Sequence, residues 1–204
     1  MPKQYVLSEI FYSLQGEGMH AGQAAVFVRF AGCNLKCTKD AAGFDCDTDF
    51  RERTRMTAEK IAARVFELMP TRCMVIFTGV EPALQLDDEL IEAFRGPRGR
   101  LTYLAIETNG TVPILHDLDW TTVSPKTSLS SLKVKSCDEL KVVIGAKGGL
   151  PLGWEDYDAL HMLVSPRFID NRIDPEALSN CLRLIKEYPQ WQLTVQLHKM
   201  LGLQ

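Results

Sequence analysis

The sequence predicts an α/β fold with mostly parallel strands, arranged as an incomplete TIM-type barrel. Three observations lead to this prediction. Apolar strand patterns alternate with helical patterns along the chain, which is typical of βα units on a parallel sheet. Polar motifs come directly after three predicted strands, at the edge where a parallel sheet presents its ligand sites. The chain has 204 residues, fewer than the roughly 250 of a complete eight-stranded barrel.

The first predicted elements lie between residues 24 and 107. Ala24–Phe30 is a short apolar run that predicts a strand. Thr57 is a helix N-cap, because apolar residues follow it at helical spacing until Pro70 ends the pattern. The chain then predicts a strand buried on both faces, a helix and a further strand, at Cys73–Phe77, Asp87–Phe94 and Leu101–Glu107.

The second half of the chain continues this alternation. Short apolar runs predict strands at Thr121–Val123, Leu140–Ile144 and Leu160–Val164. Asp174 followed by Pro175 is a start signal for a helix, and Gln192–Leu197 is predicted as a final strand. The chain contains no internal repeat and no linker rich in Pro, Gly or Ser, so we expect one domain over residues 1–204.

The composition excludes several classes of protein. Hydrophobic residues make up 46% of the chain and charged residues 24%, which excludes a disordered or collagen-like chain. The chain has 23 Lys and Arg against 26 Asp and Glu, a net charge of −3, which argues against a nucleic-acid partner. No apolar run approaches the ~18 residues of a membrane span, and the N-terminus lacks a signal-peptide core. We therefore expect a cytoplasmic protein with no membrane partner.

Six cysteines without an export signal are expected to be reduced thiols, so their spacing is informative. Cys33, Cys37 and Cys46 lie on the loop after the first predicted strand. Three thiolates on one polar loop can hold a metal or a cluster and leave one coordination position free, whereas a closed site has four ligands. A zinc site completed by His20 or Asp47 remains an alternative, as does incidental occurrence.

This trio resembles the radical S-adenosylmethionine (SAM) superfamily, whose members bind a [4Fe–4S] cluster through three cysteines and SAM through the fourth iron. The last spacing in that motif is two residues, whereas eight separate the last two cysteines here. Further motifs match in order over nearly the whole chain, so that it resembles the 7-carboxy-7-deazaguanine synthase family of queuosine and 7-deazapurine biosynthesis. The matching segments are Phe11–Gly18, Phe30–Asn34, Cys46–Phe50, Thr78–Pro82, Glu107–Gly110, Ser124–Lys126 and His198–Lys199.

The resemblance implies one group of residues that binds a small pterin substrate. These residues are Leu14, Gln15, Gly16, Glu17, Arg29, Thr78, His198 and Gln204. Glycines beside an amide and a carboxylate let the backbone approach a planar ring that needs hydrogen bonds. An arginine in an apolar strand suits a carboxylate ligand. An ordinary turn and a solvent-facing arginine are the alternatives.

The resemblance also implies residues for the cofactors. SAM would contact the main chain of Val80 together with Glu81, Asn109, Ser124, Pro125, Lys126, Ser165 and Pro166, and the cluster would be held by the loop cysteines. Thr48 would bind Mg²⁺, a hard cation that favours oxygen ligands. Val80 replaces a glycine of the family motif, which is compatible with a main-chain contact only where no positive φ is required. Simple turn chemistry is the alternative for the Asn-Gly and Ser-Pro pairs.

The implied fold is the partial barrel of the radical SAM type, and the implied activity is that of a ring-contracting carbon–nitrogen lyase. It would convert 6-carboxy-5,6,7,8-tetrahydropterin to 7-carboxy-7-deazaguanine with loss of ammonia. The cluster and SAM would carry the chemistry, so no side chain is named as catalytic. The family further implies an electron-donor protein such as a flavodoxin, and a homodimer. Two alternatives remain: a radical SAM activating enzyme that acts on a partner protein, and a non-catalytic zinc-binding module.

Overall fold

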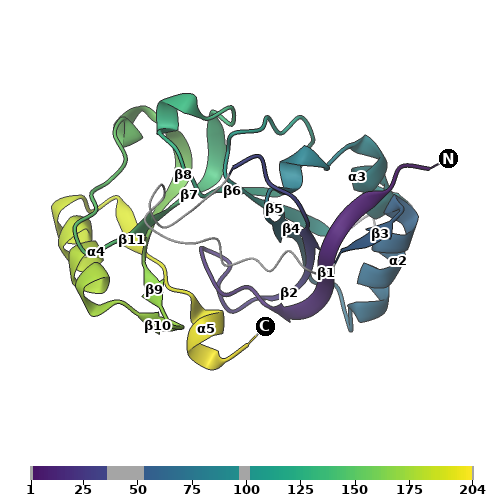
Figure 1. Ribbon diagram of the computed structural model, residues 1–204, viewed down its shortest axis with the longest axis horizontal. Coiled ribbons are helices and arrows are strands. Elements are labelled where there is room, and N and C mark those ends of the chain that lie inside the picture. The colour runs from purple at the N-terminus through teal and green to yellow at the C-terminus, as the bar shows by residue number, and fades with distance from the viewer. Residues whose placement is uncertain (1, 36–52, 97–101, 204) are drawn as a thin grey trace. The chain divides into compact units, whose positions relative to one another are not determined.

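A computed structural model describes residues 2–35, 53–96 and 102–203 of the chain. The described residues form two compact units. Unit 1 comprises Met1–Ser13, Ala24–Thr108 and Val112–Thr121, and unit 2 comprises Leu14–Gln23, Asn109–Thr111 and Thr122–Gln204. Figure 1 labels their helices and strands. The expectation of a single domain stays a prediction.

Unit 1 is built on the strand order β5-β4-β2-β1-β3. Its strands are β1 (Tyr5–Leu14), β2 (Ala24–Phe30), β3 (Thr54–Met56), β4 (Met74–Gly79) and β5 (Tyr103–Thr108). The strands β2, β4 and β5 are parallel to one another, whereas β3 is antiparallel to β1. The parallel core of this unit therefore agrees with the predicted class, and β1 and β3 extend it.

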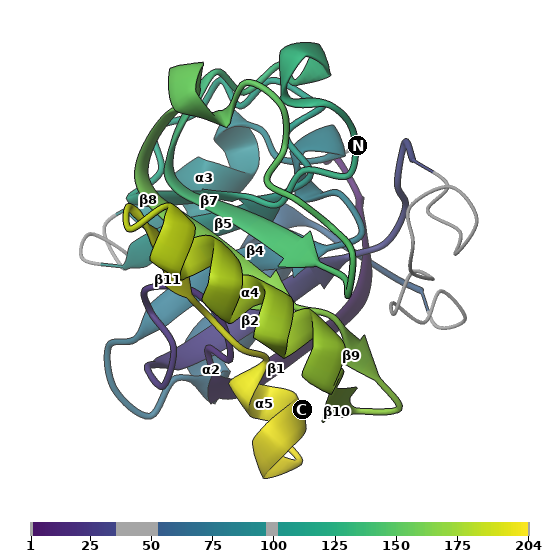
Figure 2. The same ribbon diagram turned by 90° about the vertical axis from the view of Figure 1, so that its left-hand side faces the viewer.

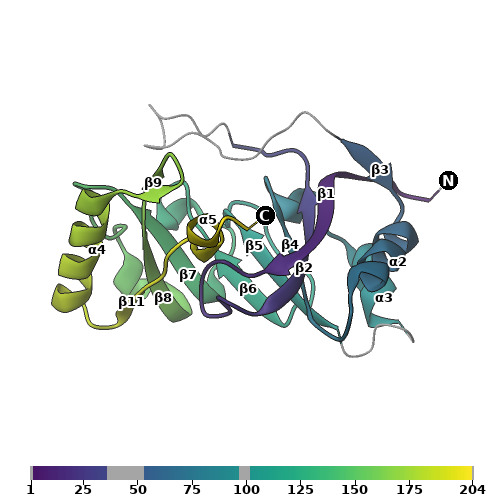
Figure 3. The same cartoon turned by 90° about the horizontal axis from the view of Figure 1, so that it is seen from below.

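Two helices cover one face of unit 1, namely α2 (Ala58–Leu68) and α3 (Asp88–Arg95), which lie side by side in Figure 3. Each begins at a side-chain cap: the Thr57 hydroxyl accepts from Lys60 N, and the Asp87 carboxylate accepts from Leu90 N. Alternate strand residues, such as Val26 and Val75, pack against these helices in one core cluster. The remaining strand residues point to the opposite face.

Unit 2 has the strand order β11-β8-β7-β6, and all of its neighbouring strands are parallel. These strands are β6 (Trp120–Val123, which begins in unit 1), β7 (Ser136–Ile144), β8 (Asp158–Pro166) and β11 (Trp191–Leu193). The helix α4 (Pro175–Glu187) packs along β8 and β11, as Figure 2 shows. Asp174 caps this helix by accepting from Glu176 N and Ala177 N, as the Asp-Pro pair predicts.

Shorter elements join the main strands and helices of both units. The hairpin of β9 (Phe168–Ile169) and β10 (Arg172–Ile173) turns through Asp170 and Asn171, both with positive φ. The helix α5 (Leu197–Leu201) follows β11. Single turns of 3-10 helix occupy Pro82–Leu84 in unit 1, and Leu129–Ser131 and Trp154–Asp156 in unit 2.

Two sequence predictions were wrong. The first strand of the chain is β1, not Ala24–Phe30, so the cysteine loop follows the second strand. The predicted final strand Gln192–Leu197 is too long, because pairing with β8 ends at Leu193 and Leu197 begins α5. The amide of Leu197 donates to Gly16 O at 2.8 Å instead of continuing the ladder.

In the described part of the chain, no helix has the length and apolar character needed to cross a membrane.

Candidate functional site

Three polar side chains share one face of unit 1 at the carboxyl ends of its parallel strands. Arg29 of β2 pairs in register with Thr78 of β4. Thr78 Oγ1 donates to Glu107 Oε2 of β5 at 2.8 Å. Because strand residues alternate between faces, these three lie on the side opposite α2 and α3. The sequence placed Arg29 and Thr78 in this site but did not single out Glu107 as a partner.

Arg29 is held by neighbours from β1. Its Nη1 donates to Glu9 Oε1 at 2.5 Å, and its guanidinium lies 5.1 Å from the centroid of the Phe11 ring. The side chain is 34% exposed, so it is neither a buried unpaired charge nor a free surface arginine. A guanidinium has five N–H donors, so the pair with Glu9 leaves donors for a carboxylate ligand.

The turn after β4 is fixed by its backbone. Gly79 has φ +109°, and a Cβ there would lie 2.4 Å from Phe30 O, so glycine is required at this position. Val80, by contrast, lies outside the left-handed region, so the valine fits the backbone without strain. Its N–H donates to Phe30 O at 3.2 Å, and Glu81 N donates to Gly32 O at 3.2 Å. The turn is thereby tied to the residues that precede Cys33.

Glu81 is fully buried at the end of this turn. Its Oε1 accepts from Thr108 Oγ1 at 2.6 Å and from Ala83 N at 3.1 Å. A buried carboxylate needs such donors to compensate for its lost hydration. The Glu81 side chain therefore holds the turn between β4 and Pro82.

The cysteine loop is described only at its start. Cys33 is half-buried, and its Sγ accepts from Leu35 N at 3.2 Å. Backbone N–H bonds of this kind stabilise cluster-ligating thiolates, so the Cys33 environment fits a cluster ligand. Cys37, Cys46 and Thr48 lie outside the described residues. Within residues 2–35, 53–96 and 102–203, no three His, Cys, Asp or Glu side chains are grouped to hold a metal ion.

In unit 2, Glu17 lies at the centre of a buried polar cluster. Its Oε2 is 2.7 Å from Lys141 Nζ, and its Oε1 accepts from Gln196 Nε2 at 2.8 Å. The two ionic side chains are only 15% and 8% exposed, respectively. Burial raises the pKa of Glu17, but the Lys141 ammonium outweighs it, with help from Gln196 and His198, and lowers the pKa to about 2. Glu17 is therefore an anion at neutral pH.

The segment around Glu17 is held tightly to the rest of unit 2. Gln15 Oε1 accepts from Glu17 N at 3.1 Å. Gly16 faces the His198 imidazole so closely that a Cβ on Gly16 would lie 2.1 Å from Nδ1. Gly18 N donates to Thr194 Oγ1 at 2.8 Å, and this glycine has φ +75°. The sequence-predicted residues Gln15, Gly16, Glu17 and His198 are thus brought together.

A second buried carboxylate supports the same segment. Glu139 Oε2 of β7 accepts from Met19 N at 2.9 Å. Glu139 and Lys141 are two residues apart on β7, so both side chains point to one face of the strand. Neither residue was predicted from the sequence. The available signal was two charges at alternate positions within the otherwise apolar strand end around Leu140–Ile144.

The other predicted residues occupy turns and strand ends. Leu14 is the last residue of β1. Asn109 Oδ1 accepts from Thr111 N at 2.9 Å, and Lys126 Nζ donates to Ser124 Oγ at 2.9 Å. Ser165 is buried at the end of β8, followed by Pro166. Pro125 lies between Ser124 and Lys126, and Gln204 is outside the described residues.

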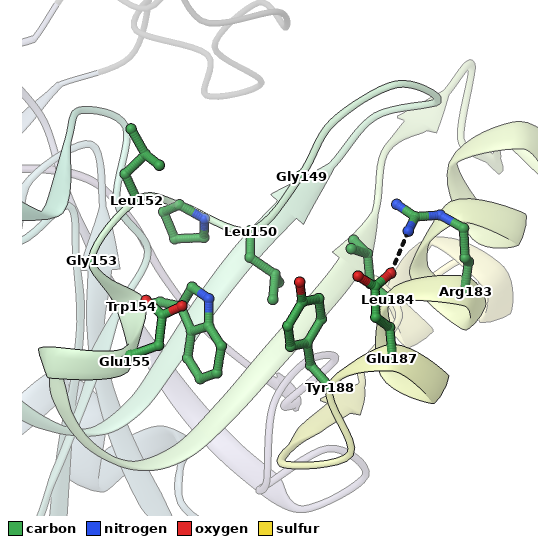
Figure 4. Close-up of a pocket in the computed structure, with 11 residues that line it drawn as sticks. Gly149, Leu150, Leu152, Gly153, Trp154, Glu155, Arg183, Leu184, Glu187 and Tyr188 are labelled. Carbon is green, nitrogen blue, oxygen red and sulfur yellow. Dashed lines mark hydrogen bonds and ion pairs between the residues drawn. The ribbon is translucent and has the colours of Figure 1, made fainter.

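A surface pocket of about 350 Å³ also lies in unit 2, between the segment 149–155 and the end of α4 (Figure 4). Trp154, Tyr188 and the ion pair of Arg183 with Glu187 line it. None of the residues predicted to bind substrate or SAM is among its lining residues. We therefore assign it no part in the site.

Comparison with known proteins gives close relatives. The chain is 40% identical to a 7-carboxy-7-deazaguanine synthase of Nitratidesulfovibrio vulgaris, covering 98% of this chain and 99% of the relative. It is also 40% identical to a synthase of the same name from Bacteroides thetaiotaomicron, with 97% of each chain covered. No protein-family model matches the chain. A crystal structure of QueE from Escherichia coli has a similar fold, with a TM-score of 0.69 at 21% identity over 96% of this chain and 95% of that chain.

Proposed function

Because this chain belongs to the 7-carboxy-7-deazaguanine synthase family, we propose that it converts 6-carboxy-5,6,7,8-tetrahydropterin to 7-carboxy-7-deazaguanine and ammonia. The observation that carries this proposal is the 40% identity over nearly the full length of two synthases. The α/β fold supports it, because the similar structure of QueE covers 96% of this chain.

The cofactors of this reaction would be a [4Fe–4S] cluster, SAM and Mg²⁺. The residues that would hold the cluster are Cys33, Cys37 and Cys46, and Thr48 would bind Mg²⁺. When bound, the cluster and SAM supply a 5′-deoxyadenosyl radical that abstracts hydrogen from the substrate. The half-buried Cys33 thiol with its N–H donor supports this role for the loop.

On the SAM side, the turn after β4 presents its main chain. The N–H of Val80 is used by Phe30 O, so the carbonyl oxygen of Val80 is the group that would accept from the methionyl ammonium. Glu81 would act through the turn that its carboxylate holds. The remaining SAM contacts would come from Asn109, Ser124, Pro125, Lys126, Ser165 and Pro166, which lie at turns and strand ends.

On the substrate side, the contacts are those that the family resemblance implies. Arg29 would bind the carboxylate with the guanidinium donors that Glu9 does not use. Thr78 would lie beside it, since it is the register partner of Arg29. Glu17 would accept from the pterin ring, with Leu14, Gln15, Gly16, His198 and Gln204 completing that end. These residues orient the substrate and exclude water from it.

Two partner assignments belong to the same proposal. An electron-donor protein such as a flavodoxin would reduce the cluster, because SAM cleavage consumes one electron. The family resemblance is also the support for a homodimer.

The proposal is tested by anaerobic reconstitution of the full chain with iron and sulfide, followed by reductant, SAM, Mg²⁺ and the carboxypterin. We expect a brown protein that forms 7-carboxy-7-deazaguanine and ammonia from the carboxypterin. Cys33→Ala should lose both colour and turnover. The matched control is Cys73→Ala, the same substitution at the residue just before β4, which should retain both. Formation of 5′-deoxyadenosine without the deazaguanine would leave a radical SAM enzyme with a different substrate.

A further inference from the structure

The pair of Glu17 and Lys141 is unusual for its burial. Their charged atoms are 2.7 Å apart, and both side chains are at most 15% exposed. Removing two charges from water is costly, and a well-packed apolar pair of similar volume often serves a fold as well. We therefore expect the two buried charges to serve a function other than stability.

The acceptor capacity of Glu17 indicates that function. A carboxylate has about four lone-pair sites, two on each oxygen. Lys141 occupies one side of Oε2 and Gln196 one side of Oε1. Two of these sites, one on each oxygen, are therefore available to a ligand with two adjacent N–H donors. The ring N–H and the exocyclic amino group of a 2-amino-4-oxopyrimidine form such a donor pair.

The anionic state of Glu17 matters for this match. A protonated carboxyl would present an O–H donor to a ligand donor, and one contact would be lost. Lys141 of β7 and His198 of α5 are the titratable groups that act on the Glu17 carboxylate, and the Lys141 contribution is the larger. Glu139, on the same face of β7, is occupied by Met19 N.

Lys141 is also well placed to fix the direction of the carboxylate. It lies in the middle of β7, in register with Leu163 of β8. Glu17 lies on the turn between β1 and β2, whose conformation depends on glycines. The turn is held through its backbone, and a charge fixed on a strand within a sheet sets the direction of the Glu17 carboxylate.

We propose that Lys141 is a positioning residue that keeps the Glu17 carboxylate anionic and oriented toward the ligand. The site thereby selects heterocycles with a 2-amino-4-oxopyrimidine edge over their 2-oxo counterparts. The inference rests on the proposed function, because the pterin substrate carries that edge. Lys141 acts through Glu17.

The test compares ligand binding to the reconstituted, unreduced holoenzyme by calorimetry between pH 5 and pH 8. The probes are 6-carboxy-5,6,7,8-tetrahydropterin and its 2-oxo analogue. In the unsubstituted protein, the preference for the 2-amino ligand should exceed tenfold and stay constant over this range. In Lys141→Met, affinity for the 2-amino ligand should fall at least tenfold at pH 5, recover as the pH rises, and the preference should shrink. Lys141→Arg should restore the constant profile.

The matched control is Lys147→Met, the same substitution at an exposed lysine just after β7, which should behave as the unsubstituted protein. A Lys141→Met protein with unchanged affinity, pH profile and preference would overturn the inference. If Lys141→Met does not fold, the double variant Lys141→Met/Glu17→Gln removes both charges and should fold. It should then bind the 2-amino and 2-oxo ligands with similar affinity at every pH, and a retained preference would overturn the inference.

A second readout separates this inference from the proposed function. The side-chain carbonyl signal of Glu17 in ¹³C-labelled protein reports its ionisation without any ligand. We expect the pKa of Glu17 to lie below the ordinary glutamate value in the unsubstituted protein and above it in Lys141→Met. An unchanged low pKa in Lys141→Met would overturn the role of Lys141 even if the pterin is the substrate. A raised pKa in Lys141→Met, with no pterin bound by the unsubstituted protein, would instead refute the proposed substrate.

Discussion

Each of the two units contains an ion pair that includes one candidate substrate residue, and the two pairs differ in their access to water. In unit 1, Arg29 and Glu9 are about one-third exposed. In unit 2, Lys141 and Glu17 are nearly buried. Water and salt screen the first pair, so Arg29 can replace Glu9 by another carboxylate at a low cost in free energy. The second pair is protected from screening, and breaking it leaves an uncompensated charge. A partly exposed arginine suits capture of a ligand carboxylate, whereas a buried carboxylate suits fixed recognition of a ring.

The largest effect is expected from removing one partner of the buried pair. Lys141→Met should lower the free energy of unfolding at pH 7 by about 3–5 kcal/mol, because Glu17 would remain buried without a countercharge. Urea denaturation measures this loss. The double variant Glu17→Gln/Lys141→Met should recover much of the lost free energy of unfolding. If Lys141→Met alone is as stable as the unsubstituted protein, burial does not make this pair more important for stability than the pair in unit 1.

The next effect concerns acid. Burial and the Lys141 ammonium together leave the folded-state pKa of Glu17 at about 2, against an ordinary value of 4.5. The resulting stabilisation of roughly 3 kcal/mol is complete above pH 4.5 and is lost as the pH falls towards 2. Urea denaturation at a series of pH values should show a smaller acid-induced loss of stability in Glu17→Gln than in the unsubstituted protein. Equal losses of stability in the two proteins would mean that folding does not lower the pKa of Glu17.

A smaller effect is expected where the buried region is tightly packed. Gly16→Ala would place a methyl group against the His198 ring, and relieving that overlap should cost about 1–3 kcal/mol. The displaced imidazole should also raise the KM for the pterin. Gly149→Ala is the control, because a Cβ there would meet open space. Thermal unfolding and steady-state kinetics of both variants would decide the matter.

The smallest effect is expected at the exposed pair. Glu9→Gln should change the free energy of unfolding by less than about 1 kcal/mol, as is usual for solvent-exposed ion pairs. Because Arg29 keeps its charge, carboxypterin should still bind, and its affinity should become more sensitive to salt. A loss as large as that of Lys141→Met would show that exposure does not distinguish the two pairs.

Local sequence signals predicted most of the regular elements. The β-branched and aromatic run Ala24–Phe30 is a strand with those bounds, and the caps at Thr57 and Asp174 begin helices where predicted. The strand β1 was missed because it carries serine, glutamate and tyrosine among its apolar residues and belongs to no strand–helix alternation. The end of β11 was missed because a distant residue, Gly16, binds Leu197.

Sequence motifs identified residues of the candidate site, but they could not predict the contacts that these residues make. Gln15, Gly16, Glu17 and His198 were singled out, and they lie together in unit 2. The partners that set their charge and direction, Lys141 above all, depend on a non-local fold and leave only a faint mark in the sequence.

The connection between Glu17 and Gln196 has a consequence for how the protein is made. These residues are 179 positions apart in the chain. The ribosome therefore releases the glycine-rich turn long before the segment that completes its surroundings has been synthesised. Contacts of such long range form late, after the entropy of closing a large loop has been overcome. Nascent chains that stop short of residue 196 should acquire strands and helices but lack the hydrogen bond that completes the surroundings of Glu17. Binding competence should therefore appear only after the last residues of the chain have been added.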